Sequence, residues 1–145
     1  MVSIDQRTQP IVGTIKIGTN TFNDVASFIT WCTDNDVLFA GDYLILDNSH
    51  IHTSDEGFPE LVQALNKNEV EVKLLPKYSP ELNPIEFIFA FVKHILRYWF
   101  VTNVPLNEQI VAAFGLVKRS FVFKCYKHCL NPNRQSVSIS KIGNF

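Results

Sequence analysis

Two carboxylates in this 145-residue chain occupy positions from which they could do chemistry together. Asp47 directly follows the apolar run from Tyr43 to Leu46, which is the pattern of a strand buried on both faces. Glu86 comes three residues after Asn83, near the predicted start of a helix. A strand end and a helix start can bring Asp47 and Glu86 together, although 38 residues lie between them. The pair is therefore our candidate for part of a metal-binding catalytic site.

Each carboxylate also has a purely structural explanation. Asp47 could simply end its strand and begin a turn at Asn48. Glu86 could close a capping box, in which Asn83 is the N-cap and the Glu86 carboxylate accepts from the Asn83 amide. The three prolines between residues 75 and 84 favour the catalytic interpretation, because they predict a loop stiffer than capping requires.

Other polar side chains allow further interpretations. His50 and His52 have the spacing of a zinc-binding pair, but no third ligand of matching type is nearby, so a polar or phosphate-contacting role for His52 is favoured. Lys93 and Arg97 lie four residues apart on the predicted helix after Glu86. They are either solvated charges or contacts to the phosphates of a nucleic acid, and the apolar helix that carries them belongs to the core or to a subunit interface.

The spacing of apolar residues predicts the elements that position these groups. Strands are expected at 2–4 and 11–17, as a hairpin, and again at 43–46 and 70–74. Helices are expected at about 21–33, 58–66 and 83–99, with one more starting at 105–107 and running to about 121. This alternation predicts an α/β fold with helices covering a mixed sheet.

Composition sets the broader limits. Residues 1–72 carry three basic and eleven acidic side chains, whereas residues 73–145 carry ten basic and three acidic ones. An acidic half beside a basic half suits a protein that holds cations and nucleic acid, although a dipolar surface without a partner would look the same. No apolar run is long enough to span a membrane, and no secretory signal is found. Three cysteines without disulfide spacing favour a reducing, intracellular location.

At these same residues the chain resembles the mariner-like DDE transposases. Their pattern is an apolar strand, Asp-Asn and a nearby His, matched by Asp47, Asn48 and His52. A loop follows that is similar to the run Leu-Pro-Lys-Tyr-Ser-Pro-Glu-Leu-Asn-Pro-Ile-Glu at 75–86. The resemblance covers roughly residues 3–129, with Phe89 where the family typically has Trp.

The resemblance implies a ribonuclease-H-like fold and a DNA transposase or endonuclease that cuts and joins DNA at transposon ends and target. By resemblance, Asp47 and Glu86 are the second and third acidic ligands of Mg²⁺, for which Mn²⁺ can substitute, and Mg²⁺ prefers such hard oxygen donors. Asn48 and His52 would support the site. The basic side chains Lys77, Lys93 and Arg97 are expected to contact DNA.

The chain departs from this family at its amino end. The family's first Asp lies on an earlier central strand, and Asp5 falls instead in a predicted hairpin turn. We therefore expect residues 1–130 to be a partial catalytic domain that lacks amino-terminal strands and is inactive alone, followed by a polar tail at 131–145. The alternative is a decayed or domesticated transposase core that binds DNA or a protein without catalysis. A homo-oligomer and a nuclear location in a eukaryote, or a cytoplasmic one otherwise, are further expectations.

Overall fold

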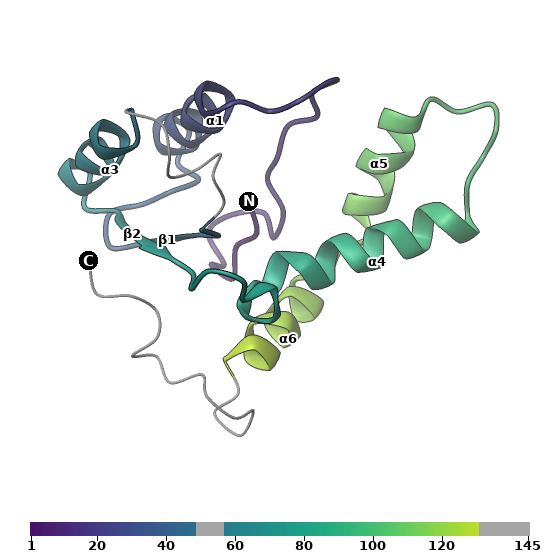
Figure 1. The fold of residues 1–145 in the computed structure, drawn as a ribbon. Helices are drawn as coiled ribbons and strands as arrows, with labels where there is room; N and C mark the ends of the chain where they lie inside the picture. Colours follow the sequence, from purple (N-terminus) through teal and green to yellow (C-terminus); the bar gives the residue numbers. More distant parts are fainter. Residues whose placement is uncertain (49–56, 131–145) are drawn as a thin grey trace. The chain divides into compact units, whose positions relative to one another are not determined.

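A computed structural model describes residues 1–48 and 57–130 of the chain (Figure 1). The described residues form two compact units, and each is described here by itself. Residues 16–48 and 57–79 form the sheet unit, and residues 1–15 and 80–130 form the helical unit.

The sheet unit consists of two helices and two parallel strands. Its elements are α1 (Phe22–Asp34), β1 (Tyr43–Leu46), α3 (Phe58–Lys67) and β2 (Glu71–Leu74). Tyr43 pairs with Glu71 and Leu46 with Leu74, so both strands end at the same edge. Figure 1 shows α1 and α3 on the same side of the strand pair.

One face of this strand pair is covered and the other is open. Leu44 of β1 and its partner Val72 of β2 are buried, and α3 packs against β2. Tyr43 and Ile45 point to the opposite face, where they are 63% and 38% exposed. Alternation along β1 therefore gives it one core face, whereas the sequence predicts a strand buried on both faces.

Local hydrogen bonds fix the start of α1. The Thr21 hydroxyl accepts from the Asp24 amide, and the Asp24 carboxylate accepts from the Thr21 amide, so the helix begins with a complete capping box. Lys16 adds an ion pair to the same carboxylate. The predicted helix at 21–33 is confirmed.

Both helices of the sheet unit end in a left-handed residue. Glu69, with φ +58°, follows α3, and there the Val70 amide donates to the Leu65 carbonyl at 3.0 Å while both of these side chains are buried. This is the Schellman ending of a helix. Asp36, with φ +54°, holds the equivalent place after α1. Positive φ at these two residues is thus a helix-stop signal.

The helical unit consists of three helices after a short 3-10 turn. Its elements are η1 (Pro80–Leu82), α4 (Pro84–Tyr98), α5 (Leu106–Gly115) and α6 (Arg119–Cys129). α4 packs against both α5 and α6. The buried core of the unit is formed by Ile88, Val92, Ala113, Val117, Val122 and Cys125.

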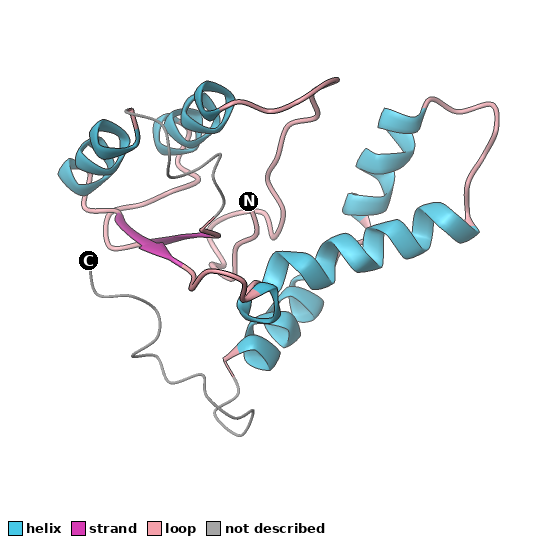
Figure 2. Cartoon of the chain, in the orientation of Figure 1, coloured by secondary structure: helices cyan, strands magenta, loops and turns pink. Residues whose placement is uncertain are grey.

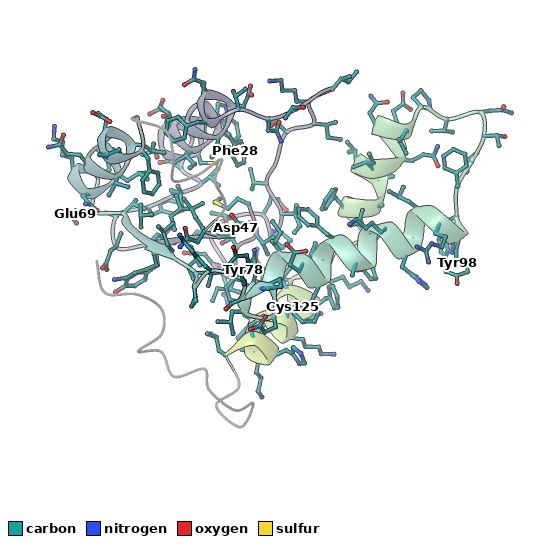
Figure 3. All side chains as sticks on the ribbon, viewed as in Figure 1. Phe28, Asp47, Glu69, Tyr78, Tyr98 and Cys125 are labelled. Carbon is teal, nitrogen blue, oxygen red and sulfur yellow. The ribbon has the colours of Figure 1, made fainter. Side chains whose placement is uncertain are left out.

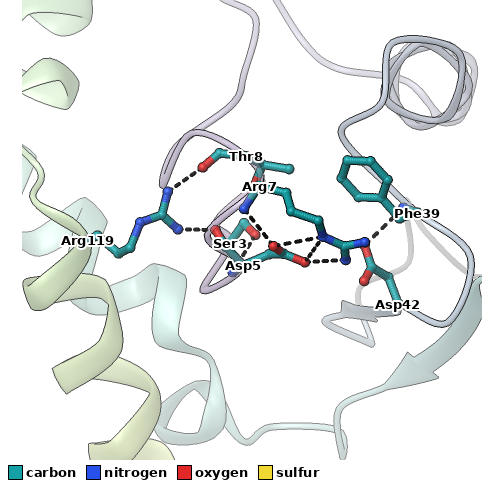
Figure 4. Close-up of polar contacts among 7 residues, drawn as sticks. All are labelled: Ser3, Asp5, Arg7, Thr8, Phe39, Asp42 and Arg119. Carbon is teal, nitrogen blue, oxygen red and sulfur yellow. Dashed lines mark hydrogen bonds and ion pairs between the residues drawn. The ribbon is translucent and has the colours of Figure 1, made fainter.

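Side chains of α6 hold the amino-terminal segment in place. The Tyr126 hydroxyl donates to the Val2 carbonyl at 3.1 Å, and burial raises the pKa of that phenol. The Arg119 guanidinium donates to the carbonyls of Asp5 and Thr8 (Figure 4). Residues more than a hundred positions away in the sequence are therefore part of the helical unit.

Two predicted secondary-structure elements are wrong in the described residues. The hairpin at 2–4 and 11–17 reduces to a single antiparallel bridge between Val2 and Ile11. Residues 13–20 are all exposed, so their β-branched side chains have no surface on which to form a strand. The helix expected from about 105 to 121 is broken into α5 and α6 at Leu116–Lys118.

The predicted strand–helix alternation is confirmed between residues 43 and 98, where it positions the candidate site. Figure 2 shows how few residues are in strands: the sheet of the described residues is one parallel pair and not the mixed sheet expected. No helix in the described ranges 1–48 and 57–130 is long and apolar enough to cross a membrane.

Candidate active site

Asp47 lies one residue beyond the end of β1. Leu44 holds the strand in the core, and the paired Leu46 is half-buried, so the backbone at Asp47 is fixed from one side. The Asp47 side chain itself is exposed, and the following Asn48 is half-buried. The predicted position of Asp47 at a sheet edge is therefore correct.

The proline loop begins beside this carboxylate. The Leu75 amide donates to the Leu46 carbonyl at 2.8 Å, which extends the parallel ladder by one bond beyond β2. Leu75 is buried, whereas Lys77 and Tyr78 are exposed. The loop thus leaves the sheet at the edge where Asp47 lies, and the charged Lys77 side chain is in solvent.

Glu86 does not form the capping box that its spacing allows. Asn83 is the N-cap of α4, and its side-chain oxygen accepts from the Ile85 amide at 3.3 Å. The Asn83 amide, which a capping box would give to Glu86, donates instead to the Pro80 carbonyl at 3.0 Å. The 3-10 turn η1 therefore satisfies the helix start without Glu86.

Glu86 is consequently available for another partner. It is exposed in the first turn of α4, and among residues 1–48 and 57–130 its carboxylate makes no hydrogen bond or ion pair. Lys93 and Arg97 are exposed on the same helix, seven and eleven residues further on. At 3.6 residues per turn these three side chains lie along one stripe.

The two carboxylates belong to different units. Asp47 is in the sheet unit, with Asn48 beside it and Lys77 in the loop after β2, whereas Glu86, Lys93 and Arg97 are in the helical unit. The Leu75–Asn83 connection joins them, and a meeting of Asp47 with Glu86 stays a prediction. The fourth predicted residue of the metal centre, His52, lies outside the described residues.

Asp5 already has a partner. Its two carboxylate oxygens accept from the Arg7 side chain, at 3.0 and 2.9 Å from Nε, and one oxygen also accepts from the Arg7 amide at 2.7 Å (Figure 4). Hydrogen bonding to Arg7 lowers the pKa of Asp5 to about 2. Asp5 is therefore tied to a local turn, as is consistent with the expectation that it is not the first metal ligand.

The available donors suit a hard divalent cation. Asp47 and Glu86 are exposed carboxylates, and carboxylate oxygens are the side-chain ligands that Mg²⁺ prefers. Cys32, Cys125 and Cys129, the softer candidates, are buried. Three or more metal-ligating side chains do not gather anywhere in the part of the chain that the structure describes.

The sequence does not predict the backbone conformation that the structure shows at Tyr78. This residue has φ +58° and is 99% exposed, at the second central position of the turn formed with Lys77. Glycine or asparagine is usual at such a position. The available signal was a turn between Pro76 and Pro80 that contains neither glycine nor asparagine.

Comparison with known proteins identifies the family of the chain. The family model described as DDE superfamily endonuclease matches residues 1–104, which is more than half of the chain. No curated protein and no solved structure matches. The helices and the small parallel sheet are consistent with the α/β fold of such nucleases. The chain belongs to the DDE superfamily of endonucleases.

Proposed function

We propose that this chain is part of a mariner-like DNA transposase domain in which Asp47 and Glu86 hold one Mg²⁺ ion. Endonucleases of this superfamily act on DNA and generally use divalent metal ions. One observation carries the proposal: Glu86 is left unengaged at the start of α4, and the loop leading to it starts beside Asp47. The ribonuclease-H-like fold that the sequence resemblance implies would bring the two carboxylates together.

The bound ion would activate a water or a 3′-hydroxyl for attack on a phosphodiester and stabilise the leaving oxygen. Asp47 and Glu86 would supply oxygen ligands from two separate backbones, one at a strand end and one in a helix first turn. The positive end of the α4 dipole favours a carboxylate or a phosphate at this place. Asn48 and His52 would orient the ligands or the substrate.

The stripe on α4 suggests where the DNA would lie. With a rise of about 1.5 Å per residue, Lys93 is about 10 Å and Arg97 about 16 Å from Glu86 along the helix. These spacings correspond to a few nucleotides of one strand, at about 3.4 Å each. Lys93 and Arg97 would therefore hold phosphates flanking the scissile one, and Lys77 would also contact DNA.

This chain supplies two carboxylates to a site that resembles three-carboxylate sites. Asp5 is committed to Arg7, and no third acidic group joins Asp47 or Glu86 in the described residues. With two ligands a single ion can bind, but a second would lack a bridging oxygen. We therefore expect residues 1–145 alone to bind a divalent ion weakly and to nick DNA slowly at best.

Nicking of supercoiled plasmid tests this function. The purified chain is assayed with Mg²⁺ and with Mn²⁺, next to Glu86→Gln and Asp5→Asn, with folding checked by circular dichroism. Slow nicking that needs Mn²⁺ and disappears in Glu86→Gln supports the proposal, and Asp5→Asn should nick like the parent. Nicking that survives Glu86→Gln would place the chemistry elsewhere.

The second candidate is a metal-independent DNA-binding module. It is favoured by the charge of the helical unit, which has seven basic and four acidic residues in its described part. The two functions separate in a binding assay with EDTA. Duplex binding that is unchanged by EDTA and by Glu86→Gln, but weakened in Lys93→Glu with Arg97→Glu, together with no nicking by the folded chain, would favour the module. Because the chain would bind DNA in both cases, we expect it to act in the nucleus of a eukaryotic cell, or in the cytoplasm of any other.

A further inference from the structure

Tyr78 has a strained backbone conformation that no helix ending or packing contact in the described residues explains. Among the described residues, three non-glycine residues have positive φ: Asp36, Glu69 and Tyr78. The first two end helices, where a left-handed residue closes the hydrogen-bonding pattern. Tyr78 ends no helix, and a bulky residue in this region is an outlier that calls for a functional explanation.

The Tyr78 side chain gains nothing from packing. It is 99% exposed, and its hydroxyl makes no hydrogen bond within the described ranges. A glycine would serve the turn with less strain, and a polar residue would serve the surface better. The aromatic ring thus lies in solvent, although tyrosine is a disfavoured residue in this backbone conformation.

The surrounding loop restrains the backbone that carries the ring. Pro76 and Pro80 fix φ on either side, and the Ser79 hydroxyl donates to the Lys77 carbonyl at 3.4 Å across Tyr78. At the loop's origin, the Leu75 amide is bonded into the parallel ladder. An aromatic ring presented on a stiff support loses little conformational entropy when it binds a flat partner.

The position of Tyr78 relative to the candidate site indicates the partner. Tyr78 is four residues past Leu74, the pairing partner of Leu46, so at most about 14 Å of chain separates it from the strand end. Asp47 is one residue past Leu46, at the same edge of the same unit (Figure 3). A DNA strand at Asp47 would therefore pass within a few nucleotides of the ring, with the exposed Lys77 beside it for a phosphate.

We propose that Tyr78 is a base-stacking residue that binds an unpaired nucleobase of DNA close to the Asp47 edge. This inference rests on the proposed function, because it takes DNA as the substrate. Exposed aromatic rings next to cations are the usual platforms for unstacked bases, since every base offers a flat face. A paired duplex keeps its bases stacked inward, so the contact is specific to single-stranded, gapped or flipped-out nucleotides.

Glycine and phenylalanine substitutions separate binding from folding. Tyr78→Gly removes the ring and relieves the positive φ, so its thermal midpoint should equal or exceed that of the parent by a few degrees, about 3 °C per kcal/mol of strain relieved. Tyr78→Phe keeps the ring and loses only the hydroxyl. Glu69→Gly is the matched control, since it relieves the same backbone conformation at a helix end away from the loop.

The test is binding of a single-stranded oligonucleotide that contains 2-aminopurine, in EDTA, with the full chain. The parent, Tyr78→Phe and Glu69→Gly should quench 2-aminopurine fluorescence, whereas Tyr78→Gly should bind about tenfold more weakly. The affinity for a fully paired duplex of the same sequence should change less than twofold in all variants.

Several results would overturn the inference. Equal single-strand affinity of Tyr78→Gly and the parent would remove the stacking role while leaving the proposed function intact. Equal losses for single strand and duplex would show that the ring serves general DNA contact. Loss of self-association in Tyr78→Gly with DNA binding unchanged would assign the ring to a second copy of the chain. No DNA binding by the folded parent would refute the inference and the proposed function together.

Discussion

At the scale of single residues, Glu86 shows how two roles for one position can be separated by a single hydrogen bond. Asn83, Pro84 and Glu86 have the spacing of a capping box, and this spacing cannot distinguish a capping carboxylate from a catalytic one. The Pro80 carbonyl distinguishes the two roles, because it accepts the hydrogen bond from the Asn83 amide that a capping box would give to Glu86. The 3-10 turn that makes this possible depends on how the loop folds back, which no local pattern predicts.

Substitution at the start of α4 should therefore separate the cap from the carboxylate. Asn83→Ala removes the acceptor of the Ile85 amide and should lower the free energy of unfolding by about 1 kcal/mol. Glu86→Gln should lower it by less than about 0.5 kcal/mol, through the helix dipole alone. Urea denaturation of both variants measures the two effects. Losses of equal size would show that Glu86 caps the helix after all.

Asp24 provides a pH-dependent contribution to stability. Its hydrogen bonds with Lys16 and Thr21 lower the pKa to about 2 from a reference of 3.8. Because the folded pKa lies below the unfolded one, this contribution is present above about pH 4 and is lost as the pH falls toward 2. Asp5, held by Arg7, behaves in the same way.

We expect the free energy of unfolding to fall between pH 4 and pH 2, and to fall less in Asp24→Asn than in the parent. Denaturation midpoints at pH 5, 4, 3 and 2 measure this. Asp34→Asn, on the same helix, is a control. Parallel pH profiles for the parent and Asp24→Asn would contradict the assignment.

At the scale of elements, the helices were predictable wherever a cap and an apolar stripe coincide. Asn83 with Pro84 marks the start of α4 in the sequence as well as in the structure, whereas for α1 the sequence allows Asn20 or Thr21 as the cap and the structure has Thr21. The break between α5 and α6 was missed because Phe114, Val117 and Phe121 keep helical spacing across it. Gly115, at the end of α5, was the available signal.

The predicted hairpin failed for a different reason. Residues 11–17 have the composition of a strand, but β propensity is realised only against a surface that buries one face. Ile17 is 99% exposed and Ile15 is 47% exposed, so no such surface lies beside them in the described residues. Whether a strand forms depends on partners that composition does not reveal.

Gln109 is an element-scale feature that the sequence did not indicate. It is buried in α5, and its amide accepts from the Val101 amide at 2.9 Å and donates to the carbonyls of Val101 and Val104 at 2.9 and 2.7 Å. One side chain thus satisfies three backbone groups of the connection between α4 and α5. Glutamine is polar, so periodicity places it outside the core.

Removing the Gln109 amide should destabilise the helical unit. Gln109→Leu leaves these three backbone groups without their partner and should cost about 1–3 kcal/mol. Asn107→Ala, exposed on the same helix, should cost less than about 0.5 kcal/mol. Thermal and urea denaturation of the two variants give the comparison. Similar costs would mean that water replaces the Gln109 bonds.

At the scale of the whole molecule, the two units differ in charge. The described residues of the sheet unit carry eight acidic and four basic side chains, and those of the helical unit carry four acidic and seven basic ones. The acidic first half and the basic second half of the sequence correspond roughly to these two units, because the chain crosses from one unit to the other near residue 80.

The open sheet face is the second whole-molecule feature. Parallel sheets are normally covered on both faces, and a two-stranded sheet is marginal by itself. Tyr43 and Ile45 leave apolar surface exposed on β1. We expect concentration-dependent self-association, visible in sedimentation velocity between about 5 and 100 µM, and reduced in Ile45→Lys. A monomer over this range would contradict the expectation of a homo-oligomer.

The most direct test of the central claim is to ask whether Asp47 and Glu86 share one metal ion. Fe²⁺ bound in place of Mg²⁺ reduces added hydrogen peroxide to hydroxide and a hydroxyl radical, which cuts the nearby main chain, and mass spectrometry locates the cuts. If Asp47 and Glu86 share one ion, cuts are expected near both residue 47 and residue 86. Excess Mg²⁺ and Glu86→Gln should each suppress both cuts together. Cuts near only one of these residues, or cuts that persist in Glu86→Gln, would contradict the claim.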